Sequence, residues 1–228
     1  MVLILVGVFD GQDVLDVCQA ADGAQPFQCV HFSWYNRYTT QGDNAPTDLH
    51  PHWMHVEGVG KTNYSQFFPY QSSDVAEHEQ LYHNVTTAFS NVFLWIESML
   101  RAYLPEEYNI LVQFIDNLPG NAQSTVFPFA SLVININICT KAHRDKKDQT
   151  ICLVVPIGEF EGGDLVLYEQ GLVLDLRSGD IAVFCSAETT HFNLQYTGQR
   201  ASFVLQTDSE FDKWLVQRNG WRDNIHFQ

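Results

Sequence analysis

The chain has 228 residues, of which 45% are hydrophobic, and this composition argues against general disorder and for a folded globular protein. The formal net charge is -15, from 27 acidic and 12 basic residues, and a field of that sign repels phosphates over long range. Nucleic-acid binding therefore requires a local basic patch. The five cysteines include no CxxC pair, which argues against a disulfide framework and favours an intracellular location, nuclear or cytoplasmic.

The first third of the chain, 1–72, has a mixed pattern. Its apolar start, 1–9, predicts a buried strand, because it lacks the features of a signal peptide and is too short to span a bilayer. Short strands are also predicted at 27–35 and 53–56. No segment is long and apolar enough to cross a membrane, so we expect no membrane association. His50, His52 and His55 are interpreted as part of a surface loop, with a substrate-contacting loop or a second metal site as alternatives.

A long support helix is predicted over 73–104. Asp74 and Glu77 stand in a capping-box arrangement at its start. Apolar residues then recur at three- and four-residue steps from Leu81 to Tyr103, which is the period of an amphipathic helix. Pro105 is expected to end the helix. We interpret the apolar stripe as a face that packs on the core.

The rest of the chain reads as short strands separated by glycine-rich turns, followed by a closing helix at 208–220. The strands are predicted at 108–115, 129–140, 150–157, 165–168, 172–176, 181–185, 193–196 and 201–207. This pattern indicates a sandwich or a jelly-roll barrel, that is, a double-stranded β-helix. Because no linker is visible, we predict one α+β domain over 1–228: a mixed part at 1–72, the support helix at 73–104 and a jelly-roll core with a C-terminal helix at 105–228.

A candidate metal site lies in this second half. His143 and Asp145 are two residues apart at a strand end, where both side chains can point to the same side, and His191 comes from another strand. Two imidazoles and one carboxylate suit Fe(II) held on one face, with the opposite positions open. Arg200 can grip a carboxylate of a second ligand through two parallel hydrogen bonds. A zinc site, or a loop without metal, remains an alternative.

Two further polar groups flank this site. Asn135 and Asn137 interrupt an apolar strand and, being two residues apart, are expected to face the same side. They either face the barrel interior and touch a ligand or bond neighbouring backbone. A basic loop at 141–147 either forms a solvated surface or contacts phosphate groups. The basic loop contains four residues: Lys141, Arg144, Lys146 and Lys147. Nucleophilic catalysis is not indicated, because there is no G-x-S-x-G elbow and no phosphate-binding glycine loop.

The segments around these residues resemble the Fe(II)/2-oxoglutarate dioxygenases, and in particular the TET/JBP-like branch that is abundant in mushroom-forming fungi. The segments that carry the resemblance are 129–148 (FASLVININICTKAHRDKKD), 158–168 (GEFEGGDLVLY), 172–184 (LVLDLRSGDIAVF) and 191–208 (HFNLQYTGQRASFVLQTD). The resemblance implies that His143, Asp145 and His191 bind Fe(II). It also implies that Arg200, with Ser202 and Asn137 beside it, binds 2-oxoglutarate, and that O2 takes the last iron position.

The expected reaction follows from this resemblance. The family hydroxylates a C–H bond while 2-oxoglutarate is converted to succinate and CO2. Because the TET/JBP branch oxidises methyl groups on nucleobases, the expected substrate is 5-methylcytosine or N6-methyladenine in DNA, contacted by Asn135 and Arg144. The acidic net charge leaves open a small metabolite, a free nucleoside or a protein side chain as substrate, and also a non-enzymatic metal-binding jelly-roll module. The sequence predicts no oligomeric state.

Overall fold

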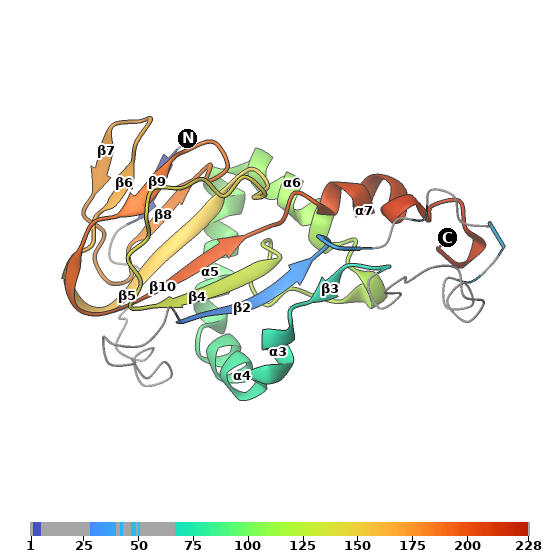
Figure 1. The fold of residues 1–228 in the computed structure, drawn as a ribbon, viewed down its shortest axis with the longest axis horizontal. Helices are drawn as coiled ribbons and strands as arrows, with labels where there is room; N and C mark the ends of the chain where they lie inside the picture. Colours follow the sequence, from blue (N-terminus) through green and yellow to red (C-terminus); the bar gives the residue numbers. More distant parts are fainter. Residues whose placement is uncertain are drawn as a thin grey trace.

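The computed structural model describes residues 2–5, 28–39, 42, 47–48, 50 and 67–227. Its described strands are β1 Val2–Leu5, β2 Gln28–Tyr35, β3 Tyr70–Gln71, β4 Ser131–Ile136, β5 Cys152–Gly162, β6 Leu165–Leu167, β7 Leu172–Leu174, β8 Ile181–Phe184, β9 His191–Asn193 and β10 Tyr196–Gln206. They form a seven-stranded sheet in the order β1-β8-β5-β10-β4-β2-β3 and a three-stranded sheet in the order β7-β6-β9 (Figure 1). All neighbouring strands are antiparallel.

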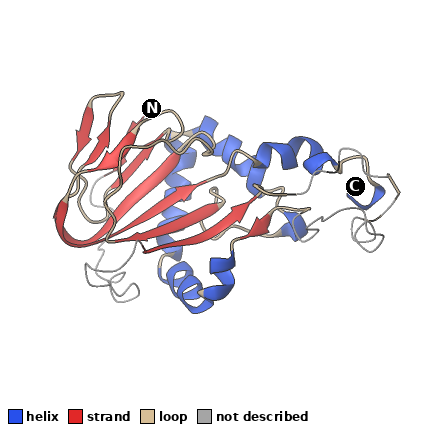
Figure 2. Ribbon diagram, in the orientation of Figure 1, coloured by secondary structure: helices blue, strands red, loops and turns tan. Residues whose placement is uncertain are grey.

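Helices lie behind the large sheet and beyond one end of its strands, as Figure 2 shows. They are α3 Ser73–Glu77, α4 Glu79–Ala88, α5 Ser90–Tyr103, α6 Pro105–Ile115 and α7 Phe211–Gln217, with short 3-10 turns at η2 Pro119–Asn121, η3 Arg218–Gly220 and η4 Ile225–Phe227. Among the described residues, no helix has the length and apolar character needed to cross a membrane.

The main core lies between the large sheet and helices α4 to α6. Successive residues of a strand point to opposite faces, so each strand presents one apolar face to the helices. On β10 this face carries Phe203 and Leu205, which are almost completely buried, and on β4 it carries Leu132 and Ile134. The aromatic ring of Phe89 packs edge-on against that of Phe203, with centroids 5.1 Å apart. The opposite face of the same strands is therefore free to line a cavity.

A smaller core joins the two sheets. It is made of the buried residues Cys152, Leu165, Leu167, Leu176, Ala182 and Phe184. These come from β5 and β8 of the large sheet, from β6 of the small sheet and from the loop between β7 and β8. The small sheet is thus held over the large one, and the space between them stays open further along the sheet. This two-sheet arrangement with helices on one sheet agrees with the prediction.

Two predictions of secondary structure are wrong. The support helix expected over 73–104 is divided into α3, α4 and α5, because His78 and Phe89 leave the helical conformation, although i to i−4 hydrogen bonds continue across both residues. The segment 108–115 was expected to be a strand, but it belongs to α6. Pro105 begins this helix instead of only ending the previous one, and two acidic residues follow in its first turn, where they favour the helix dipole.

The capping box is also not formed. The residue before α3 is Ser72, which makes no side-chain cap hydrogen bond, and the carboxylate of Asp74 instead accepts a hydrogen bond of 2.7 Å from the backbone N–H of His31. Asp74 thereby ties the helix to β2.

The other predicted strands are present with shifted ends. β9 begins at His191, before the predicted start at 193, and β10 begins at Tyr196, so Arg200 lies inside this strand and not ahead of it. The predicted closing helix is α7 followed by η3. The predicted strand at 53–56, the remainder of 1–9, and His52 and His55 lie outside the described residues.

Candidate metal centre

The three predicted metal ligands lie together. His143 and Asp145 come from the loop between β4 and β5, and His191 is the first residue of β9. His143 and His191 form an isolated antiparallel bridge, in which the backbone N–H of each donates to the carbonyl of the other, at 3.1 and 2.9 Å. One ligand atom from each of the three side chains lies within 4.8 Å of the others. The backbone pairing thus brings together ligands that are far apart in the sequence.

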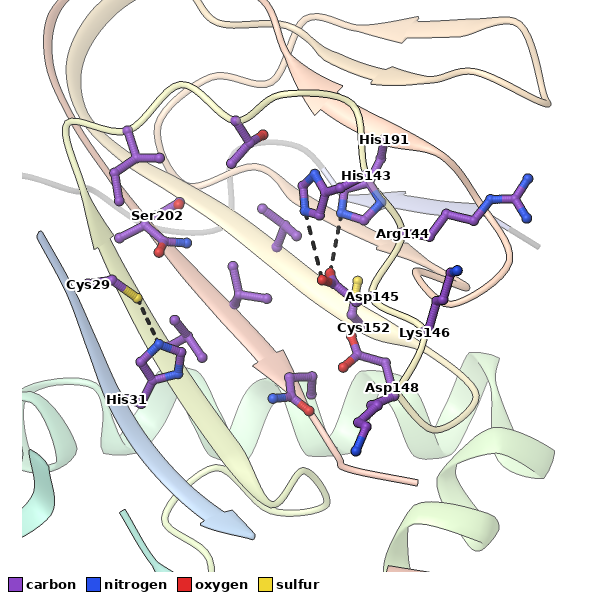
Figure 3. A pocket seen from close by; sticks show the side chains of 18 of the residues that line it. Cys29, His31, His143, Arg144, Asp145, Lys146, Asp148, Cys152, His191 and Ser202 are labelled. Carbon is purple, nitrogen blue, oxygen red and sulfur yellow. Dashed lines mark hydrogen bonds and ion pairs between the residues drawn. The ribbon is translucent and has the colours of Figure 1, made fainter. Parts of the chain in front are cut away.

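Hydrogen bonds orient both imidazole rings. Nδ1 of His143 lies 2.6 Å from the carbonyl oxygen of Lys141, and Nδ1 of His191 lies 3.0 Å from that of Thr189. Each Nδ1 therefore donates its proton to a carbonyl, which leaves the Nε2 lone pair free for a metal. These two Nε2 atoms lie 3.8 and 3.4 Å from the carboxylate oxygens of Asp145 (Figure 3).

The charge states of these groups fit a metal site. Burial opposes ionisation of Asp145, but contacts with His191 and His143 hold the pKa of this carboxyl below its ordinary value. Burial likewise favours the neutral form of His191, whereas its hydrogen bonds with Asp145 and the Thr189 carbonyl raise its pKa overall. A divalent cation would displace that proton, since metal binding needs the neutral imidazole. Two nitrogens and one carboxylate oxygen suit Fe(II), with open positions left for further ligands.

A cavity of about 470 Å³ opens beside the three ligands, within the size range of small-molecule sites. Its walls come from the cavity-facing sides of β2, β4, β5 and β10 and from the loop that carries His143 and Asp145. The residues that line it, apart from the three ligands and the basic loop, are Cys29, His31, Tyr35, Arg37, Val133, Asn135, Ile138, Thr140, Asp148, Cys152, Val154, Leu165, Asn193, Ser202, Val204 and Gln206.

Arg200 is a buried cation without a carboxylate partner among the described residues. It is only 4% exposed, and its Nε atom has no hydrogen-bond partner. The guanidinium lies over the rings of Phe160 and Tyr196, at 5.3 and 5.6 Å from their centroids. Burial lowers its pKa, so the charged form is held at an energetic disadvantage in the absence of an anion. A guanidinium in this state can bind a carboxylate. Arg200 is not among the residues that line the cavity, but Ser202, two residues along β10, is.

The two asparagines are separated by the structure. Asn135 lies on β4 and lines the cavity, but β4 ends at Ile136, and Asn137 has a left-handed backbone with φ of 51°. The side-chain carbonyl of Asn137 accepts a hydrogen bond of 3.0 Å from the backbone N–H of Arg200. The expectation that both residues share one face is therefore wrong. Asn137 contacts backbone, which is one of the two alternatives left open above. Its hydrogen bond holds the segment of β10 that carries Arg200.

The basic loop carries less free charge than its sequence suggests. Arg144 lines the cavity, but its guanidinium forms an ion pair of 2.5 Å with Glu169 (Figure 3). Lys147 lies 3.4 Å from a carboxylate oxygen of Glu210. Lys141 and Lys146 form no ion pair within the described residues, and both are exposed. Because Arg144 is one of the residues that line the cavity, its predicted contact with substrate stays a prediction.

Several cavity residues were missed from the sequence. Gln206 is 7% exposed and lines the cavity, and its side-chain oxygen has no partner among the described residues. His31 lines the opposite wall, between Cys29 and Tyr35, which contact its two ring nitrogens at 3.1 Å each. Burial raises the pKa of Asp148 to about 7, against the effect of a 2.6 Å hydrogen bond from Ser186. Strand alternation places Gln206 on one face of β10 and His31 on one face of β2, but the sequence does not say which face borders the cavity. Asp148 lies in the loop between β4 and β5, where no such alternation applies.

Comparisons with known proteins cover the part of the chain that carries this site. A family model, Tet_JBP, described as the oxygenase domain of the 2OGFeDO superfamily, matches residues 63–206. The solved structure of NgTET1 in complex with 5mC DNA superposes with a TM-score of 0.65 at 15% identity, covering 92% of this chain and 72% of that one. This likeness confirms the double-stranded β-helix fold. No curated protein matches the chain.

Two other oxygenases overlap with a smaller part of the chain. A 2OG-Fe(II) oxygenase family protein from Burkholderia pseudomallei is 24% identical, with a TM-score of 0.31, over 34% of this chain and 43% of that one. A prolyl-4-hydroxylase from Pseudomonas putida is 19% identical, also with a TM-score of 0.31, over 34% of this chain and 48% of that one.

Proposed function

Because this chain belongs to the Tet_JBP family, the oxygenase domain of the 2OGFeDO superfamily, we propose that it oxidises the methyl group of a modified nucleobase. The chain is a 2-oxoglutarate-dependent oxidoreductase that uses Fe(II), 2-oxoglutarate and O2. Bound Fe(II) supplies the oxidation of a C–H bond, and the conversion of 2-oxoglutarate to succinate and CO2 accompanies it.

Each part of the site has a role in this reaction. His143, Asp145 and His191 hold the metal through the atoms described above. Arg200 binds the far carboxylate of 2-oxoglutarate with its planar guanidinium, and Ser202 is placed to assist it. The burial of Arg200 excludes water from this contact, which strengthens the interaction between the two charges.

The observation that carries the substrate proposal is the unpaired side-chain oxygen of Gln206. A buried polar atom without a partner is unfavourable, so a ligand that offers a hydrogen-bond donor is favoured at this place. Gln206 faces the same cavity as the metal ligands, and Asn135 offers a second amide there. A nucleobase has the flat shape and edge donors that such amides bind. Support also comes from NgTET1, whose solved structure contains 5mC DNA.

The charge distribution favours one alternative, a free nucleoside or other small substrate. The net charge is -15, and two of the four residues in the basic loop are paired with carboxylates. Only Lys141 and Lys146 in this loop remain available for phosphate groups. A polynucleotide would therefore gain little from long-range attraction, whereas a single base needs only the cavity.

The test measures succinate formation and base oxidation together, with the purified protein, Fe(II) and 2-oxoglutarate. The substrates are duplex DNA containing 5-methylcytosine or N6-methyladenine, the same single strands, and the free methylated nucleosides. We expect oxidised base from DNA, by mass spectrometry, in step with succinate. Oxidation of free nucleosides alone would assign the small-substrate alternative, and succinate without base oxidation in any sample would overturn both. The Asp145→Ala variant, which lacks one metal ligand, is the blank for metal-independent turnover.

A further inference from the structure

One exposed carboxylate connects the two segments that carry the metal ligands. Glu169 lies in the turn between β6 and β7 and accepts hydrogen bonds from Nη2 of Arg144 at 2.5 Å and from both the backbone N–H and the hydroxyl of Thr190 at 2.6 Å. Nε of Arg144 donates to the same Thr190 hydroxyl at 3.0 Å, which closes the network. These bonds lower the pKa of Glu169 to about 2, so the carboxylate is ionised.

The positions of these partners relate the network to the metal. Arg144 stands between His143 and Asp145, and Thr190 directly precedes His191. The carboxylate of Glu169 therefore contacts the immediate neighbour of every metal ligand, from a third segment of the chain. A further bond from the turn, Gln170 Nε2 to Thr189 Oγ1 at 3.0 Å, holds the residue whose carbonyl orients the His191 ring.

The turn is itself fixed to β9. The backbone N–H of Tyr168 donates to the carbonyl of Thr190 at 2.9 Å, and Leu167 pairs with His191 in the small sheet. The loop that carries His143 and Asp145, in contrast, is joined to β9 through hydrogen bonds between Thr140 and Asn193, the bridge between His143 and His191, and the Arg144–Glu169–Thr190 network. The network is the side-chain contact between Arg144, which lies between the two ligands of the loop, and the residue before His191. Without it, the bridge and the hydrogen bond of 3.1 Å from the Asp145 backbone N–H to the Ser186 carbonyl would hold this part of the loop.

We propose that Glu169 is a positioning residue of the metal centre, which fixes the His143–Asp145 loop against β9 so that the three ligand atoms converge. Glu169 is not among the residues that line the cavity beside the metal ligands. The proposal is independent of which substrate the enzyme oxidises. Removing a group that orients a metal ligand typically lowers the metal affinity by about 10- to 100-fold.

The test is a metal titration rather than an activity assay. Mn(II), a redox-stable substitute for Fe(II), is titrated into the metal-free wild type and the Glu169→Ala and Glu169→Gln variants, with binding followed by calorimetry and the metal environment by electron paramagnetic resonance. We expect the Mn(II) Kd to rise by about 10- to 100-fold in Glu169→Ala and by less in Glu169→Gln, since a neutral amide keeps an acceptor for Thr190 but loses the ion pair.

The controls separate positioning from a general loss of folding. Glu161→Gln removes an exposed glutamate of β5 that has no contact with the metal loop, and it is expected to bind Mn(II) like the wild type. Arg144→Met removes the other member of the ion pair. Because both substitutions break the same network, the losses of Mn(II) affinity in Arg144→Met and Glu169→Gln should not add in the double variant. This pair also serves if Glu169→Ala does not fold. A Mn(II) Kd within twofold of wild type in Glu169→Gln and Arg144→Met, or additive losses, would overturn the proposal.

Discussion

The Arg200→Met variant is expected to separate co-substrate binding from folding. The guanidinium is buried, lacks a carboxylate partner among the described residues and has one nitrogen without any hydrogen bond. Each hydrogen bond to a charged group contributes about 1.5–3 kcal/mol. Two parallel bonds to the co-substrate carboxylate therefore contribute about 3 kcal/mol at the lower limit, which is roughly 100-fold in Kd for 2-oxoglutarate.

The effect on the ligand-free protein has the opposite sign. Methionine fills a similar space between Phe160 and Tyr196, its sulfur packs well against aromatic rings, and it carries no charge that burial disfavours. We expect the ligand-free variant to unfold at the same temperature as the wild type or a higher one. In the presence of Mn(II), added 2-oxoglutarate should raise the unfolding temperature of the wild type and leave that of the variant almost unchanged.

The assay combines thermal unfolding with calorimetric titration of 2-oxoglutarate into the Mn(II)-loaded protein. Arg177→Met, at an exposed arginine of the β7–β8 loop, is the matched control and should behave like the wild type. A Kd for 2-oxoglutarate that changes by less than threefold in Arg200→Met would refute the role of Arg200. Loss of Mn(II) affinity in the same variant would show that the substitution disturbs the whole site and not the carboxylate contact.

Three other outcomes test the core, the metal site and the basic loop. Leu132→Ala, at a fully buried residue between sheet and helices, should lower the free energy of unfolding by about 2–5 kcal/mol in chemical denaturation. Asp145→Ala should abolish the stabilisation that Mn(II) gives against thermal unfolding, while the far-ultraviolet circular dichroism spectrum stays that of the wild type. Removing the metal from the wild type with a chelator should likewise abolish this stabilisation. If DNA is the substrate, Lys141→Ala and Lys146→Ala should each reduce the slope of log affinity against log salt by about one, and Lys147→Ala by less.

Residues whose role depends on local spacing could be predicted from the sequence. The His143-x-Asp145 pair and His191 were assigned to one site because their donor types and positions at strand ends suit a metal, and the structure brings them within 4.8 Å. Most strands were also predicted, since β-branched runs between glycines are a local signal. The segment 108–115 was misread because YNILVQFI has strand-like composition. Its helical state depends on Pro105 and the acidic first turn that precede it.

Residues whose role depends on long-range contacts could not be predicted in the same way. Glu169 is one exposed acid among many in the sequence, and its importance arises only when the turn after β6 meets Arg144 and Thr190. Gln206 was likewise part of a predicted strand, but the sequence did not indicate that its face borders a cavity. Asn137 was placed with Asn135 by strand alternation, which fails because β4 ends one residue earlier.

The alternation of the large sheet has a practical consequence for altering substrate range. Along β10, Ser202, Val204 and Gln206 face the cavity, while Phe203 and Leu205 between them pack on the helices. Neighbouring positions in one strand are therefore constrained differently: the cavity-facing residues by the shape of the ligand, and the helix-facing residues by packing in the core. A library restricted to the cavity-facing positions would vary what the enzyme accepts while every helix-facing contact of the core stays intact.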